Sequence, residues 1–143
     1  MMKSFFVLVM TFLLSTFLVA QTCPKVKERI ESLNLSFEQE ILEMTNIERH
    51  KYGLKPLKLD ESLTYSARYH AKDMATEDYF EHDSYDRKNG RLKKSCSIFD
   101  RIEAFANYGY LAENISAGKT SPEEVVKGWM NSEGHRKNVL NKK

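Results

Sequence analysis

The spacing of apolar positions changes several times along the chain, and each change marks an expected element. From Phe37 to Ile47, apolar residues recur every three or four positions, which is the spacing of an amphipathic helix. Ser36 stands three residues before Gln39, which predicts a capping box, and Gly53 is placed to end the helix. We therefore expect a first helix over about four turns.

A second helix is predicted after a short connector around Pro56. Asp60 is suited to cap this helix, which should run to about Glu77. His70 lies beside the expected apolar stripe, so we interpret it as a residue at the boundary of the buried surface. The expected buried stripe consists of Leu63, Ala67, Ala71 and Met74.

The region 83–97 is polar and basic and contains Gly90, so we predict a loop. No aromatic residue is interleaved among its basic residues to stack bases, and the net charge of the whole chain is only +2. We therefore expect a solvated basic loop and no nucleic-acid partner. The basic residues are Arg87, Lys88, Arg91, Lys93 and Lys94.

Shorter elements are expected in the last third of the chain. The apolar positions of 98–105 predict a short helix, and the apolar segment 110–116 predicts a strand. Ser121 as cap, with Pro122 at the first helical position, predicts the start of another helix. The expected buried face of that helix consists of Val125, Val126, Trp129 and Met130.

The first twenty residues have the order of a secretory signal peptide. A basic start at Lys3 precedes an uncharged apolar run that ends in Ala20 before a polar break. We predict a signal peptide over 1–20, a flexible lead-in over 21–35 and one domain over 36–143, located outside the cell or in a periplasm. The alternative is an uncleaved segment that anchors the chain in a membrane.

Two cysteines, Cys23 and Cys96, fall in the expected exported part. In an oxidising compartment they could form one disulfide, which in the chain-entropy model contributes roughly 4 kcal/mol. A lipid-modified Cys23 or two free thiols are the alternatives. Contact with a membrane is expected only through an uncleaved signal segment or a lipidated Cys23.

Three ionisable residues are expected at the ends of elements: His82, Glu113 and His135. Two imidazoles and one carboxylate would suffice for an open zinc site. His82 and His135 are 53 residues apart, so their meeting in space is an assumption. Histidines hydrogen-bonded for purely structural reasons are the alternative.

An ordered set of motifs resembles the CAP superfamily of cysteine-rich secretory, antigen 5 and pathogenesis-related 1 proteins, and its bacterial SCP-like branch most closely. The motifs are Tyr79-Phe80-Glu81-His82, Ala112-Glu113-Asn114-Ile115 and Gly134-His135-Arg136. The resemblance implies an α+β fold, a CAP-like α-β-α sandwich with helices on both sides of a small antiparallel sheet. It also implies a cleft with His82 and Glu113, to which His135 is matched more loosely.

The resemblance also marks two departures from the family pattern. Ser132 stands where a second cleft glutamate is expected, and only three residues follow Leu140, where family members continue into further strands of the sheet. The sheet is therefore expected to lack its C-terminal strands, as in a fragment or truncated product, or to borrow them from a partner.

We expect a secreted, non-enzymatic binding module that holds an apolar ligand such as a lipid or sterol, or an extracellular protein partner. No cofactor is required for this function. The first alternative is a metal-dependent hydrolase that uses His82, Glu113 and His135, with a divalent metal such as zinc held by His82 and His135. The second is an inactive truncated family member.

Overall fold

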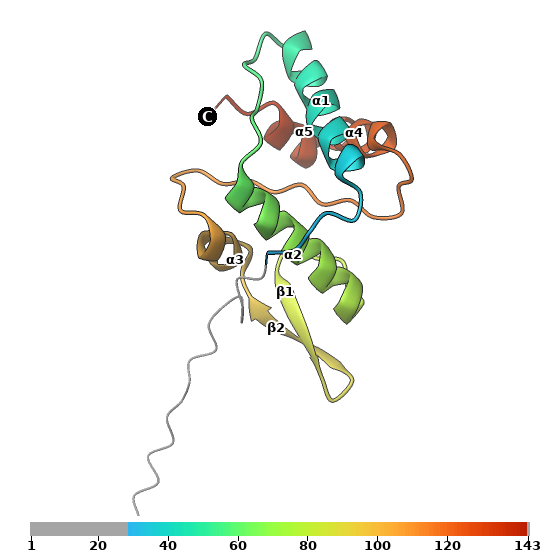
Figure 1. Ribbon diagram of the computed structural model, residues 1–143, viewed down its shortest axis with the longest axis vertical. Coiled ribbons are helices and arrows are strands. Elements are labelled where there is room, and N and C mark those ends of the chain that lie inside the picture. The colour runs from blue at the N-terminus through green and yellow to red at the C-terminus, as the bar shows by residue number, and fades with distance from the viewer. Residues whose placement is uncertain (1–28, 143) are drawn as a thin grey trace, which may run out of the picture.

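The computed structural model describes residues 29–142, and its elements fall into two groups (Figure 1). One group contains the helices α1 (Leu35–Lys51), α4 (Pro122–Asn131) and α5 (Glu133–Val139). The other contains α2 (Glu61–Glu77), the strands β1 (Ser84–Lys88) and β2 (Arg91–Cys96), and α3 (Ile98–Phe105). We call them the three-helix group and the hairpin group. The segment from α3 to α4 runs between them (Figure 1).

The fold is mixed helix and antiparallel strand, so the predicted α+β class is confirmed. The expected strand at 110–116 is wrong, because this segment forms no ladder with any described strand. A strand is defined by its partner's hydrogen bonds, and here side chains hold the segment instead. The predicted signal peptide lies outside the described residues.

The helix starts follow local capping chemistry, with one correction. Asp60 caps α2 by accepting from the Leu63 amide at 2.9 Å, as predicted. The first helix begins two residues earlier than expected, because Asn34 rather than Ser36 is the cap and accepts from the Phe37 amide. Ser36 donates its hydroxyl to the Asn34 side chain at 2.9 Å.

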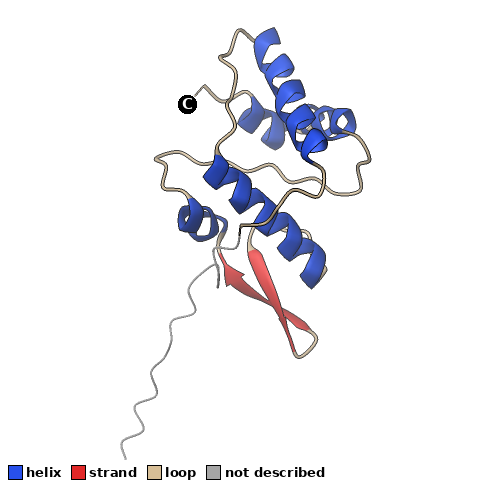
Figure 2. Ribbon diagram, viewed as in Figure 1, coloured by secondary structure: helices blue, strands red, loops and turns tan. Residues whose placement is uncertain are grey.

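A β-hairpin occupies the region predicted to be a loop (Figure 2). Asn89 and Gly90 form its two-residue turn and both have positive φ, +53° and +75°. This conformation matches the twist of antiparallel strands, and Asn-Gly is the pair that adopts it most readily. The prediction failed because the charged residues around this turn were interpreted as a loop composition.

The buried surface of α2 differs from the predicted stripe. Ala67 and Ala71 are exposed, whereas Ser66 and His70 are buried, at 3% and 2% exposure. His70 is thus a core residue and not a boundary residue. Alanine gains little from burial, so a stripe that depended on two alanines was weakly determined.

The core of each group is small. In the three-helix group it is built on Val125, Val126 and Val139, each at most 5% exposed, which confirms the predicted face of α4 at its two valines. In the hairpin group Ile102 is buried beside polar residues that the sequence did not place in a core. Those polar residues are Ser66, His70, Ser84 and Arg101.

Candidate functional site

His82 and Glu113 lie in contact, as the resemblance implied. The His82 Nδ1–H donates to Glu113 Oε1 at 3.0 Å. His82 lies in the bend just before β1, and its side chain is 46% exposed, whereas the Glu113 side chain is 14% exposed. When the imidazole is neutral, this bond fixes the proton on Nδ1 and leaves the Nε2 lone pair available for a ligand or a proton.

Arg101 lies beneath this pair and is fully buried, at 0% exposure. Its guanidinium donates to Glu113 Oε2, to the His82 carbonyl at 2.7 Å and to the Ser84 hydroxyl at 3.3 Å. A buried charge is stable only when it is paired and hydrogen-bonded, and Glu113 supplies the opposite charge. Among the described residues, the Arg101 Nε–H has no hydrogen-bond partner.

His70 completes the network from α2. Its Nδ1 accepts from Arg101 at 3.0 Å, so its proton lies on Nε2, which donates to the Glu81 carbonyl at 2.9 Å. Burial, together with the positive charge of Arg101, lowers the pKa of His70 below its usual value. His70 is therefore held neutral and acts as a fixed acceptor for Arg101.

Side chains of the three-helix group position the segment that carries Glu113. Asn138 Nδ2 donates to the Glu113 carbonyl at 3.2 Å and to the Asn114 side-chain oxygen at 2.9 Å. The Trp129 indole N–H donates to the Ile115 carbonyl at 3.2 Å. The network therefore draws on both groups of elements, which meet at Glu113.

His135 lies in α5, and the Asn114 amide donates to its backbone carbonyl at 3.1 Å. No ion pair or hydrogen bond joins its side chain to His82 or Glu113 among the described residues. Within 29–142, no three His, Cys, Asp or Glu side chains are grouped so that they could hold a metal ion. The predicted trio is thus brought together only in part.

The donor chemistry does not suit a zinc site in this arrangement. Both oxygens of Glu113 already accept hydrogen bonds, one from His82 and one from Arg101. A metal at His82 would require Glu113 to give up one of these donors and a further ligand to approach. Metal binding by His82 and His135 stays a prediction.

Two other predicted positions are placed as follows. Ser132 lies at the junction of α4 and α5 as the cap of α5, without a side-chain capping bond. Cys96 is buried at the end of β2 and disulfide-bonded. Its predicted partner, Cys23, lies outside the described residues, so this pairing stays a prediction.

Sequence reasoning missed Arg101 and His70 as members of the site. The signal for Arg101 was its position three residues after Ile98 and one before Ile102, on the apolar stripe of a helix. A charged residue on such a stripe needs a buried partner. For His70 no comparable signal exists, since its burial depends on how the hairpin packs against α2.

A second concave feature lies between the start of α1 and α2, away from this network. It is a cavity of about 670 Å³ with an apolar wall. Its lining also carries two cations, Arg68 and Lys72, and two carboxylates, Glu31 and Glu38, and Arg68 pairs with Glu38 at 2.6 Å. The apolar wall consists of Ile30, Leu33, Phe37, Ala71 and Ala75.

The structure is thus a mixed α+β domain in which the Glu113 carboxylate is held between a buried arginine and an exposed histidine. The family model for the cysteine-rich secretory protein (CAP) family matches residues 42–143. The chain belongs to the CAP family, whose proteins are generally extracellular. The resemblance inferred from the motifs is thereby confirmed.

Two curated relatives come from Bacillus subtilis (strain 168). The chain is 48% identical over 107 residues to the uncharacterized protein YkwD, covering 74% of the chain and 38% of YkwD. It is 36% identical over 115 residues to the uncharacterized membrane protein YlbC, covering 80% of the chain and 31% of YlbC. The chain thus spans about a third of each relative.

No solved structure matches the chain significantly. Within the described part of the chain, none of the helices has the length and apolar character needed to cross a membrane.

Proposed function

We propose that this domain is a secreted, non-enzymatic binding module for a ligand with an extended apolar part, such as a fatty acyl chain. The observation that carries the proposal is the apolar cavity between α1 and α2. Its volume of about 670 Å³ lies within the range of small-molecule sites. Ala71 and Ala75 leave room along the α2 wall, because their side chains are a single methyl group.

The charged residues that line the cavity are balanced, with Arg68 and Lys72 as the cations and Glu31 and Glu38 as the carboxylates. Burial raises the pKa of Glu38, but the hydrogen bonds from Arg68 and Ser32 and the charge of Arg68 together hold it below its usual value. Glu38 is therefore ionised at neutral pH and offsets one of the two cations. The apolar wall, rather than an excess of charge, therefore supports the binding of an acyl chain.

Acyl-chain binding can be tested by displacement of a fluorescent fatty acid with unlabelled saturated acids of ten, twelve and fourteen carbons. Each buried methylene is worth about 0.8 kcal/mol, so two more carbons should tighten binding roughly tenfold. Ala71→Phe should fill the cavity and weaken binding at least tenfold. Affinities that change neither with the chain length of the acid nor with Ala71→Phe would exclude this function.

Ala67→Phe is the matched control. Ala67 is an exposed alanine one turn earlier on α2 and does not line the cavity. Ala67→Phe adds the same ring to the same helix but outside the cavity, so ligand binding should remain as in the parent. Equal losses in both variants would indicate general damage to α2, so a loss confined to Ala71→Phe is the result that supports the cavity as the binding site.

A second candidate, hydrolysis, rests on the His82–Glu113 contact. With its proton held on Nδ1 by Glu113, His82 Nε2 could take a proton from a water whose oxygen attacks a carbonyl carbon. The same nitrogen would return the proton to the leaving group as its bond to that carbon breaks. This reading uses no metal ion.

The test of hydrolysis is turnover of a panel of activated esters and peptides. General-base loss typically costs a hundredfold or more, so His82→Ala should lower any rate by at least that factor. His50→Ala is the control, because His50 is an exposed histidine in the last turn of α1. Equal rates in both variants would exclude His82 as the base.

A further inference from the structure

The β1–β2 hairpin extends beyond the helices at one end of the molecule, and its two faces carry different chemistry (Figure 1). Residues directly opposite each other on paired strands point to the same face. The register pairs Tyr85 with Lys94 and Arg87 with Leu92, and these four define the paired face. Asp86 with Lys93, and Lys88 with Arg91, define the basic face.

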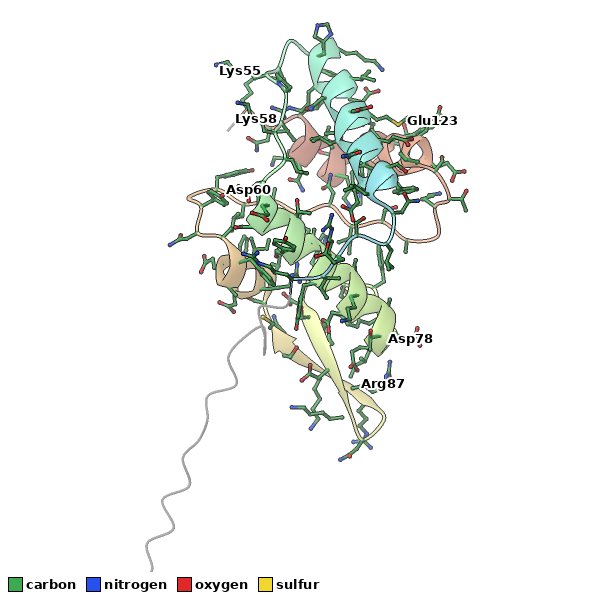
Figure 3. The ribbon with its side chains drawn as sticks, viewed as in Figure 1. Lys55, Lys58, Asp60, Asp78, Arg87 and Glu123 are labelled. Carbon is green, nitrogen blue, oxygen red and sulfur yellow. The ribbon has the colours of Figure 1, made fainter. Side chains whose placement is uncertain are left out.

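The two cations of the paired face, Arg87 and Lys94, each bind oxygen acceptors from residues outside the hairpin. The Arg87 guanidinium donates to the Glu77 carbonyl at 2.5 Å and to the Asp78 carbonyl at 3.2 Å, at the C-terminal end of α2 (Figure 3). Lys94 pairs with Asp83 at 2.5 Å. Both cations therefore have structural roles that explain their presence.

Two cations of the basic face, Arg91 and Lys93, are not matched in this way. The basic face carries three cations and one carboxylate, Asp86, whose contact with Lys88 is 3.8 Å long. Arg91 and Lys93 are exposed, and neither forms an ion pair with any residue in 29–142. Lys88 and Arg91 stand directly opposite each other, and like charges in that position destabilise a strand pair.

We propose that the basic face docks on the surface of an anionic phospholipid bilayer. The face combines a local excess of positive charge with an arrangement that costs the isolated hairpin stability, and a layer of lipid phosphates would offset both. The inference is independent of the acyl-chain cavity, which lies on other elements.

A bilayer fits this face better than a nucleic acid or another chain-like polyanion. The cations lie on a projecting two-stranded face, and the cavities described around α1 and α2 include no hairpin residue. Proteins that follow a single strand use a groove and aromatic side chains that stack bases. Lysines on exposed strands also discourage edge-to-edge pairing, but that role does not require cations directly opposite each other.

The experiment is co-sedimentation of the full chain with vesicles of phosphatidylcholine, with or without one-third phosphatidylglycerol. Each cation near an anionic surface contributes roughly a fivefold factor, so Arg91→Gln with Lys93→Gln should weaken binding to the anionic vesicles about 25-fold. The control, Lys55→Gln with Lys58→Gln, removes the same charge at the opposite end of the molecule and should leave binding unchanged (Figure 3). All variants share the apolar segment 4–20, so differences among the variants report the substituted charges.

Arg91→Glu separates docking from a role in the hairpin alone. It places a carboxylate opposite Lys88, which should slow amide hydrogen exchange in the hairpin by roughly twofold while it weakens vesicle binding at least tenfold.

Equal losses in the hairpin and Lys55/Lys58 variants, or equal binding to neutral and anionic vesicles, would overturn the proposal. So would binding to a soluble phosphodiester polymer with none to vesicles.

Discussion

Both groups of elements contain a buried arginine, but the two arginines are satisfied differently. Arg49 of the three-helix group is 4% exposed and donates to three backbone carbonyls, those of Lys55, Val139 and Asn141, at 2.7–2.9 Å. Arg101 of the hairpin group is 0% exposed and bonds three side chains and one carbonyl. Arg49 is thus held by main-chain carbonyls, whereas Arg101 is held mainly by polar and ionisable side chains.

The difference indicates where function can lie. Arg49 meets the carbonyls at the C-terminal end of α5, where a cation is favoured by the helix dipole, and none of the ionisable side chains in 29–142 is hydrogen-bonded to it. Arg101 holds Glu113, which in turn orients the exposed His82. Only the second arrangement transmits a buried charge to a group that solvent or a ligand can reach.

Arg101→Met should produce the largest loss of stability. Removing one partner of a buried pair leaves the other charge uncompensated, and such changes typically cost about 3–5 kcal/mol. Glu113, His70 and Ser84 would all lose a donor. Urea unfolding would measure the change, and a loss no greater than that of Arg49→Met would contradict the distinction between the two arginines.

Arg49→Met should cost less, about 2–3 kcal/mol, because it removes charge-assisted bonds to neutral carbonyls. We expect amide exchange to increase mainly at residues 139–141 and around residue 55, whose carbonyls lose their donor. Exchange in the β-hairpin should stay as in the parent. Faster exchange in the hairpin would show that the two groups are coupled through more than the segment at Glu113.

A smaller effect is expected from the pH dependence of His70. Burial and the neighbouring Arg101 lower its pKa in the folded state, whereas Glu113 and Asp73 oppose that shift. Stability from the neutral imidazole is therefore complete above the unfolded pKa of about 6.5 and is lost as pH falls below it. Thermal unfolding between pH 7.5 and 5 should show this loss, and His70→Gln should reduce the slope. An unchanged slope would assign the pH dependence to other groups.

The sequence could predict the elements whose signals are local. The caps of α2 and α4 and the position of α3 follow from residues within one turn, and the structure confirms them. The contact of His82 with Glu113 was implied by the family resemblance alone. His70 and Arg101 could not be placed, because their burial depends on packing between α2, β1 and α3.

The prediction of a strand around Glu113 was wrong for a related reason. Its apolar residues have strand propensity, but a strand needs a partner, and propensity is overridden when side chains of other elements hold the backbone. Here Asn138 and Trp129, from α5 and α4, occupy carbonyls of the segment. Only the folded arrangement of those helices decides its conformation.

Gly90→Ala should cause the smallest loss of stability, and comparison with Gly53→Ala tests whether each group of elements responds by itself. Gly90 in the hairpin turn and Gly53 after α1 both have positive φ, +75° and +67°, and a methyl group at either would meet no atom within 4 Å. Backbone strain is then the only cost, about 1–2 kcal/mol at each position. Because each glycine ends an element of a different group, Gly90→Ala should raise amide exchange in β1 and β2 only, and Gly53→Ala in the last turn of α1 only. A loss of protection that spread from Gly90 to α4 would show that hairpin and three-helix group unfold together.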